Sequence, residues 1–254
     1  MCMIQKIKMF SKYKKLLLSS FLLALFLFFF VCNGISFQKG VGKEVLVKNV
    51  LKAYGGEDNL RNTKNMIIDG EVNALFKKKR GTSRIYIQYP DRFKIEIRYK
   101  DSYEVLILNK DRGWKSVGGD FVEVKGPPLD VMLFSFRTIN VPLELLSPEN
   151  DVSYSGLKQR GDKIFEVLEI SNRKNKKIVL YIDPKTYLIK RVKGFINLDN
   201  EITELEKEYG NFKKIDGIFY PYSAVSYASG SKKIFANVRE IILNPQLTDK
   251  MFMH

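Results

Sequence analysis

Polar and apolar side chains alternate from residue 202 to 227, and this pattern predicts two antiparallel β-strands. Glu204, Glu206 and Glu208 fall on one side of the first strand, and Leu205 and Tyr209 fall on the other. A period of two is typical of a strand with one solvated face and one buried face. Between the strands, Asp216-Gly217 tolerates the positive φ values that a two-residue hairpin turn requires. The chain therefore contains antiparallel sheet with one apolar face.

The same alternation recurs along most of the chain. It is clearest at residues 93–100, where phenylalanine, isoleucine and tyrosine alternate with charged side chains. Residues 105–108 are apolar at every position, as in a central strand that is covered on both faces. Turn residues separate these segments, and we predict about ten to twelve strands between residues 66 and 243.

Two segments have helical rather than strand periodicity. Apolar residues recur at helical spacing from residue 43 to 54, and Gly55-Gly56 provides a natural helix end. A second, short helix begins at Gly126-Pro127-Pro128 and interrupts the run of strands. The residues spaced along one face of this second helix are Leu129, Met132, Leu133 and Phe136.

The first 38 residues have the composition of an export signal. They contain lysines but no acidic residue, and a run from residue 16 to 31 is apolar except for Ser19 and Ser20. Cleavage near Gly34 or Ser36 would release the mature protein. A retained membrane anchor and lipidation at Cys32 are the two alternatives.

The remaining residues, 39–254, are expected to form a single β domain, because all-β architectures often reach this length as one domain. Both cysteines, Cys2 and Cys32, lie in the leader, so the mature chain has no disulfide. Of 43 basic and 28 acidic residues, the leader contains five basic and no acidic ones, which leaves a net charge of +10. Such a charge favours anionic partners, and export makes an anionic membrane surface the better candidate.

Several kinds of chemistry are excluded by composition. The single histidine, His254, is the last residue, so neither a catalytic triad nor a histidine-based metal site is expected. Glycine-rich phosphate or dinucleotide motifs are missing as well. Nucleic acid is not an expected partner, since Phe93 and Tyr99 share a strand face with Ile95 and Ile97 and therefore point inward. We expect no cofactor and no enzymatic activity.

Four segments, in this order, resemble the LolA-like outer-membrane lipoprotein-sorting carriers of Gram-negative bacteria. They are residues 53–60 (AYGGEDNL), 181–188 (YIDPKTYL), 209–218 (YGNFKKIDGI) with Pro221, and 237–252. The resemblance implies a mainly β, LolA/LolB-like fold: an incomplete, half-open antiparallel β-barrel of about 11 strands, with an N-terminal helix and a short helical lid. It also implies a hydrophobic interior that shelters acyl chains.

On this basis the chain is expected to be a periplasmic carrier of acyl chains of lipoproteins or phospholipids. An inner-membrane donor and an outer-membrane acceptor would be its protein partners. The candidate lining residues are Ile85, Ile87, Phe93, Ile95, Ile97, Val105, Ile107 and Trp114 from the sheet, and Leu129, Met132, Leu133 and Phe136 from the lid. For each of them an ordinary filled core is the alternative.

Two other functions remain open at this point. The same half-barrel with a filled interior could be a membrane-tethered envelope scaffold. A hydrolase acting on envelope polymers would require paired buried carboxylates in an open cleft. The acidic residues mostly alternate outward along strands or lie in turns, so we expect them to be solvated.

Overall fold

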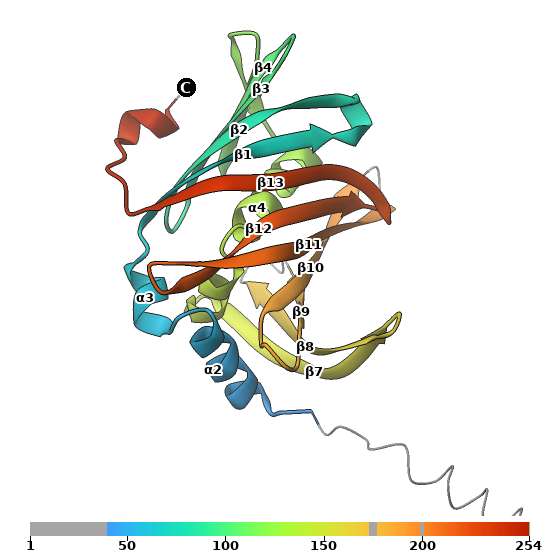
Figure 1. Ribbon diagram of the computed structural model, residues 1–254. Coiled ribbons are helices and arrows are strands. Elements are labelled where there is room, and N and C mark those ends of the chain that lie inside the picture. The colour runs from blue at the N-terminus through green and yellow to red at the C-terminus, as the bar shows by residue number, and fades with distance from the viewer. Residues whose placement is uncertain (1–39, 173–176, 199–200, 254) are drawn as a thin grey trace, which may run out of the picture. The chain divides into compact units, whose positions relative to one another are not determined.

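The computed structural model describes residues 40–172, 177–198 and 201–253 (Figure 1). The predicted leader, including Cys32, and His254 lie outside the described residues. Within these three ranges, no helix is both long and apolar enough to cross a membrane.

Strands make up most of the described chain. They are β1 (Asn65–Ala74), β2 (Lys79–Gln88), β3 (Arg92–Tyr99), β4 (Tyr103–Asn109), β5 (Arg112–Val117), β6 (Phe121–Val124), β7 (Asn150–Arg160), β8 (Lys163–Asn172), β9 (Lys177–Ile182), β10 (Ile189–Leu198), β11 (Glu201–Ile215), β12 (Ile218–Ala228) and β13 (Ser231–Leu243). The helices are α2 (Lys43–Ala53), α3 (Glu57–Asn62) and α4 (Pro127–Arg137), with short 3₁₀ helices η1 (Leu75–Lys77), η2 (Val141–Leu146) and η3 (Asp249–Phe252).

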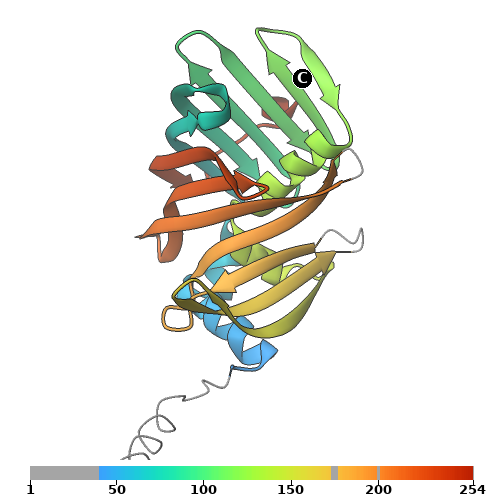
Figure 2. The ribbon, with the colours of Figure 1, turned by 90° about the vertical axis from the view of Figure 1, so that its right-hand side faces the viewer.

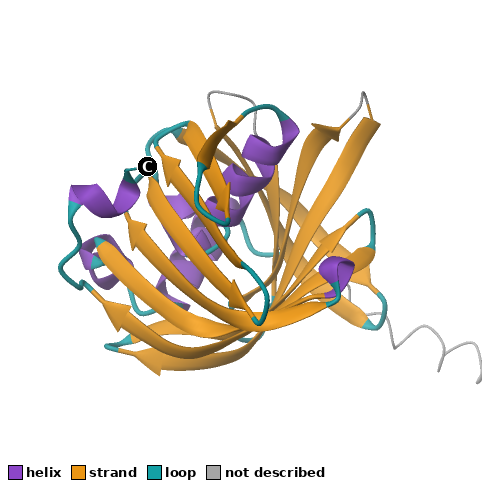
Figure 3. Ribbon diagram, turned by 90° about the horizontal axis from the view of Figure 1, so that it is seen from above, coloured by secondary structure: helices purple, strands orange, loops and turns teal. Residues whose placement is uncertain are grey.

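These strands form one antiparallel sheet, in which strands that are consecutive along the chain are neighbours, except β6 and β7. β1 pairs with β13, so the first and last strands meet in the middle of the sheet. β6 and β7 are the two edges, and the chain passes between them through α4 and η2. The sheet curves around α4 without closing (Figure 3). The predicted half-open barrel is confirmed, with thirteen strands in the described chain rather than about eleven.

The β11–β12 hairpin has the predicted two-residue turn. Ile215 pairs with Ile218, and the residues between them, Asp216 and Gly217, have φ values of 46° and 86°. Two positive φ values are what a hairpin turn that matches the strand twist requires. The end of α2 packs against this turn, since a Cβ added at Gly55 would lie 2.4 Å from the carbonyl oxygen of Gly217.

The main core lies on the inner face of the sheet. Leu46, Val50 and Leu51 of α2 join this core with the inward residues of most strands, and α4 crosses the same side (Figure 2). On the outer face, η3 packs against β3 and β4. Helices therefore cover parts of both faces, and α4 and η2 lie in the segment that connects the two edge strands.

One expectation about β11 is wrong. Glu206 was expected on a solvated face, but it is 5% exposed and forms ion pairs with Arg160, at 2.7 Å, and with Arg191. Glu204 and Glu208 are half-buried on the same face. The face is outward as predicted. However, long basic side chains from β7 and β10 lie over it and exclude water from Glu206.

Candidate functional site

α4 rests on two glycines from opposite halves of the sheet. A Cβ added at Gly113 in β5 would lie 2.9 Å from Cδ1 of Leu129, and one added at Gly194 in β10 would lie 2.6 Å from the Phe134 ring. Real Cβ atoms do not come this close to other heavy atoms, so each glycine provides room for a helix side chain. The predicted lid helix thus spans the inner face from β5 to β10.

The C-terminal end of α4 is tied to β11 by hydrogen bonds. Tyr209 Oη donates to the carbonyl oxygen of Thr138 at 2.5 Å, and Lys207 Nζ donates to the Thr138 hydroxyl at 2.8 Å. Thr138 is the C-cap of the helix and is fully buried. Burial raises the pKa of the Tyr209 phenol well above its usual range and lowers the pKa of Lys207 to about 8. The sequence contained no signal for either bond.

Nine of the twelve predicted lining residues share the inner face with α4. The pairing Ile85↔Ile95 places their side chains on the face that the main core occupies. Those that are buried are Ile87, Phe93 and Met132; those that are half-buried are Ile85, Ile95, Ile97, Leu129, Leu133 and Phe136. Half-buried apolar side chains on an inner face remain partly accessible to a ligand. Whether they bind one stays a prediction.

The other three predicted lining residues lie on the outer face. Ile107 pairs with Lys94 of β3 and with Trp114 of β5, and Val105 forms the same outer cluster with them. Cross-strand partners share a face. Val105, Ile107 and Trp114 therefore cannot line the same surface as Phe93. Because β4 is apolar at every position from 105 to 108, its sequence did not distinguish the two faces.

An ion pair lies at the far end of the inner face. Lys77 of η1 contacts both carboxylate oxygens of Glu104 in β4 at 2.6 Å, and Glu104 is 8% exposed. The Lys77 ammonium also lies 5.8 Å from the centre of the Tyr99 ring, a cation–π contact. This end of the inner face is thus bounded by a paired charge rather than by a helix.

The three buried carboxylates of the described chain lie on separate strands: Glu104 on β4, Glu166 on β8 and Glu206, paired with two arginines, on β11. Glu104 pairs with Lys77. Glu166 accepts hydrogen bonds from the Tyr154 hydroxyl at 2.5 Å and from the backbone N–H of Val41 at 3.3 Å. Each therefore has its own partner, and they lie on different strands. Among the described residues, no group of acidic, histidine or cysteine side chains could hold a metal ion.

Small side chains line the middle of the inner face, a feature that the sequence analysis missed. They follow β12 and β13 in register with Lys207 and Tyr209 of β11. The half-buried members are Ala224, Ser226, Ala228 and Ala236. Small residues at inward positions leave room between a sheet and the helix that crosses it. A stretch such as Ala-Val-Ser-Tyr-Ala was a possible signal, because only its inward positions are small.

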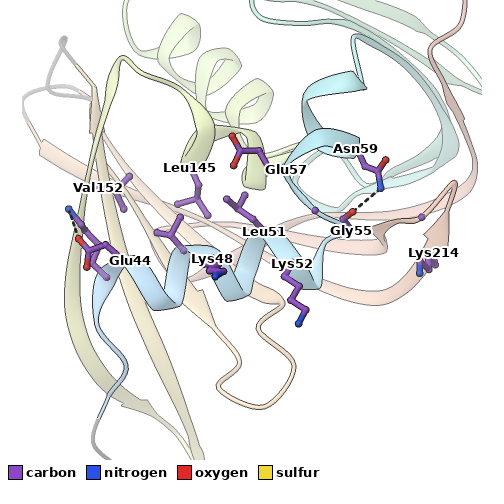
Figure 4. A pocket seen from close by; sticks show the side chains of 14 residues that line it. Glu44, Lys48, Leu51, Lys52, Gly55, Glu57, Asn59, Leu145, Val152 and Lys214 are labelled. Carbon is purple, nitrogen blue, oxygen red and sulfur yellow. Dashed lines mark hydrogen bonds and ion pairs between the residues drawn. The ribbon is translucent and has the colours of Figure 1, made fainter.

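A pocket of about 980 Å³ lies along α2 (Figure 4). Leu51 of α2 and Leu145 of η2 form part of its apolar wall, and the lysines at 48, 52 and 214 lie around it. The side chain of Asn59 donates to the carbonyl oxygen of Gly55 at 2.8 Å and holds the α2–α3 connection. This pocket combines apolar walls with a mostly basic rim.

Comparison with known proteins identifies the fold. No protein-family model and no curated protein sequence matches the chain. Among solved structures, a LolA superfamily protein from Nitrosomonas europaea is similar over 85% of this chain and 99% of its own, with a TM-score of 0.54 and 10% identity. The fold is LolA-like. The resemblance of the four sequence segments is therefore confirmed at the level of the fold.

Two further structures share this LolA-like fold. A DUF1329 family protein from Desulfovibrio piger covers 83% of this chain and 97% of its own at a TM-score of 0.55 and 14% identity. A domain described as outer membrane lipoprotein-sorting, from Vibrio parahaemolyticus, covers 82% and 95% at a TM-score of 0.51 and 13% identity. At these identities the likeness concerns the fold.

Proposed function

We propose that this protein is a carrier that binds acyl chains of lipoproteins or lipids against the inner face of its sheet and has no enzymatic activity. The observation that supports this most directly is the half-buried apolar surface beside α4. α4 packs on the sheet at two glycines, through Thr138 and through Phe136, whose ring lies 6.2 Å from that of Phe93, but α4 is not itself part of the sheet. It can therefore move without breaking any strand pairing.

The physical need for such an interior follows from the size of the ligand. Burying one methylene group contributes roughly 0.8 kcal/mol, so a long acyl chain resists entering water by about 10 kcal/mol. A flat surface covers only one side of such a chain. A curved sheet with a movable helix can surround it, and half-buried residues such as Ile95 and Leu133 would be in contact with it.

The proposed place of action is the periplasm. The basic, apolar segment at residues 1–38 supports export, either with cleavage or as a retained or lipidated anchor. The LolA-like fold supports movement of cargo toward the outer membrane. An inner-membrane protein would then donate the cargo, and an outer-membrane protein would accept it.

The pocket along α2 is proposed to face an anionic membrane surface. Lys48, Lys52 and Lys214 are exposed around it. A basic side chain near such a surface contributes about 1 kcal/mol. α2 also begins only a few residues after the proposed leader, so any anchor there would hold this pocket near the membrane.

Lipid uptake is the direct test of the carrier function. Mass spectrometry of lipid extracted from freshly purified protein should reveal bound acyl lipids, and the delipidated protein should take up a fluorescent fatty acid. Ile95→Glu, on the inner face, should weaken uptake at least tenfold. Ile242→Glu is the matched control, because Ile242 is 38% exposed and adjacent in β13 to the inward Ile241.

The uptake experiment also distinguishes a carrier function from a scaffold function of the same fold. A protein that takes up no probe and contains no lipid would have a permanently filled interior. In that case the protein would be a membrane-tethered scaffold rather than a carrier. Loss of uptake in both isoleucine variants would likewise contradict a site on the inner face.

A further inference from the structure

Lys207 is a cation on the inner face of the sheet. It lies between Leu205 and Tyr209 in β11 and pairs with Val192 of β10. Leu205, Val192 and Tyr209 are all buried, and Val192 and Tyr209 belong to the main core. Because alternate residues of a strand and their cross-strand partners share a face, the Lys207 side chain points inward, toward α4.

The Lys207 ammonium has no counterion in the described part of the chain. Its one hydrogen bond is donated to the hydroxyl of Thr138, at 2.8 Å. The neighbouring carboxylates of Glu206 and Glu208 lie on the opposite face, where both contact Arg191. An ammonium group has three donors, so one hydroxyl leaves it incompletely bonded. Burial of this unpaired charge lowers the pKa of Lys207 to about 8.

An inward, unpaired charge destabilises a fold unless something compensates for it. Lys207 is half-buried rather than sealed. Its cross-strand neighbour on β12 is Ser226, and half-buried Ala224 and Ala228 lie on either side of that serine. A ligand that reaches this strip would meet one cation among small side chains.

We propose that Lys207 binds the anionic headgroup of the acyl ligand, a carboxylate or a phosphate, beneath the C-terminal end of α4. This rests on the proposed carrier function and narrows its ligand to anionic lipids. The acyl chain then runs across β12, β13 and β1 toward Ile85 and Ile95. That path crosses five strand spacings, roughly 24 Å at about 4.8 Å each, which is comparable to an extended long acyl chain.

Thr138 gives this site a connection to the lid. Its hydroxyl accepts from Lys207 and lies 2.8 Å from the carbonyl oxygen of Phe134, to which it donates. An anionic headgroup would offer Lys207 a stronger acceptor than a neutral hydroxyl. Occupation of the site would thus draw the ammonium away from the C-cap of α4.

Comparing the binding of charged and neutral forms of the same lipid tests whether Lys207 binds an anionic headgroup. The full chain, purified and delipidated, is titrated with a fatty acid that carries a fluorescent label in its acyl chain, and with the methyl ester of the same molecule. A second pair, labelled phosphatidylglycerol and labelled diacylglycerol, distinguishes a phosphate source from a carboxylate. Wild type should bind at least one anionic member about tenfold or more tightly than its neutral partner, as expected for a hydrogen bond to a charged group.

Three variants locate the effect. Lys207→Met should reduce the affinity for the anionic lipid to that of the neutral one, and it should leave the neutral affinity unchanged. Lys207→Arg should retain the preference. Lys213→Met, an exposed lysine on the same strand, should behave as wild type.

Two results would overturn the inference while leaving the carrier function intact. One is equal affinity of wild type for the charged and neutral members of both pairs. The other is an equal loss of both affinities in Lys207→Met, which would mean a purely structural role. If no probe binds to any variant, both this inference and the carrier function fail.

Discussion

The hydroxyl of Tyr54 accepts a hydrogen bond from the backbone N–H of Ile189, at 3.2 Å. Tyr54 ends α2, and its own carbonyl oxygen accepts from the backbone N–H of Phe219, also at 3.2 Å. Tyr54, in the segment 53–60, is thus bonded to the residues that directly follow two other segments that resemble LolA-like carriers, 181–188 and 209–218. These residues are far apart in the sequence, and the two hydrogen bonds hold the end of α2 against β10 and β12.

Replacing Tyr54 tests this connection. Tyr54→Phe keeps the ring but leaves the buried N–H of Ile189 without a partner, which costs about 1–3 kcal/mol. Chemical denaturation should therefore show a lower free energy of unfolding with an unchanged denaturant dependence. Tyr187→Phe, in a half-buried turn, is the control and should change little. Equal stability of Tyr54→Phe and wild type would contradict a structural role for the hydroxyl.

The buried ion pairs of Glu206 should be worth more than an exposed pair. Glu206→Gln leaves Arg160 and Arg191 without their shared carboxylate, and because both arginines are partly exposed we expect a loss of about 1–3 kcal/mol. Glu71 pairs with Arg239 at 2.8 Å with both side chains more than half exposed, so Glu71→Gln should cost less than about 1 kcal/mol. Thermal or chemical unfolding of both variants measures the difference. Similar losses would mean that Glu206 is effectively solvated.

Gly194, one of the two glycines under α4, should not tolerate an added methyl group. The Cβ of Gly194→Ala would lie 2.6 Å from the Phe134 ring, and relieving this overlap should cost about 1–3 kcal/mol. Amide hydrogen exchange should quicken in α4 more than in the strands. Gly42→Ala is the matched control, since its Cβ meets no atom within 4 Å. Unchanged exchange in α4 would show that the helix is held elsewhere.

Lys207 should make the free energy of unfolding depend on pH in the alkaline range. Its pKa is about 8 in the folded protein, against roughly 10.4 for an unperturbed lysine. Between these values the unfolded chain holds a proton that the folded chain has released, so the free energy of unfolding rises with pH. Below pH 8 the buried charge is present in full.

Lys207→Met should therefore melt at a higher temperature than wild type at pH 7. The difference in melting temperature between Lys207→Met and wild type should decrease as the pH rises from 8 toward 10. Melting curves of both proteins across this range measure it, with Lys213→Met following wild type throughout. A gap that is constant with pH would mean that Lys207 titrates as an exposed lysine.

The basic pocket along α2 should determine membrane binding. Reversing two charges in Lys48→Glu/Lys52→Glu should abolish cosedimentation with vesicles that contain phosphatidylglycerol, at about 1 kcal/mol per lysine removed. Lys78→Glu/Arg80→Glu reverses two exposed charges near η1 and serves as the control. Equal losses in the two double variants would indicate net charge rather than this pocket.

The sequence by itself determined the elements and the class of fold. Period-two alternation identified the strands, and Asp216-Gly217 identified the hairpin turn. The apolar spacing from Leu129 to Phe136 identified the helix that crosses the sheet. These signals are local, because each depends on residues within one strand, turn or helix.

The tertiary structure decided which face of the sheet each side chain occupies and which residues it contacts. Residues 105–108 are apolar on both sides, so only pairing with β3 and β5 placed Val105 and Ile107 outside. The contact of Gly194 with Phe134 joins residues 60 positions apart, which no local pattern encodes. Likewise, Glu206 and Lys207 are adjacent polar residues in the sequence. In the described part of the folded protein, Glu206 forms ion pairs with two arginines on the outer face, whereas Lys207 on the inner face bonds only to the Thr138 hydroxyl.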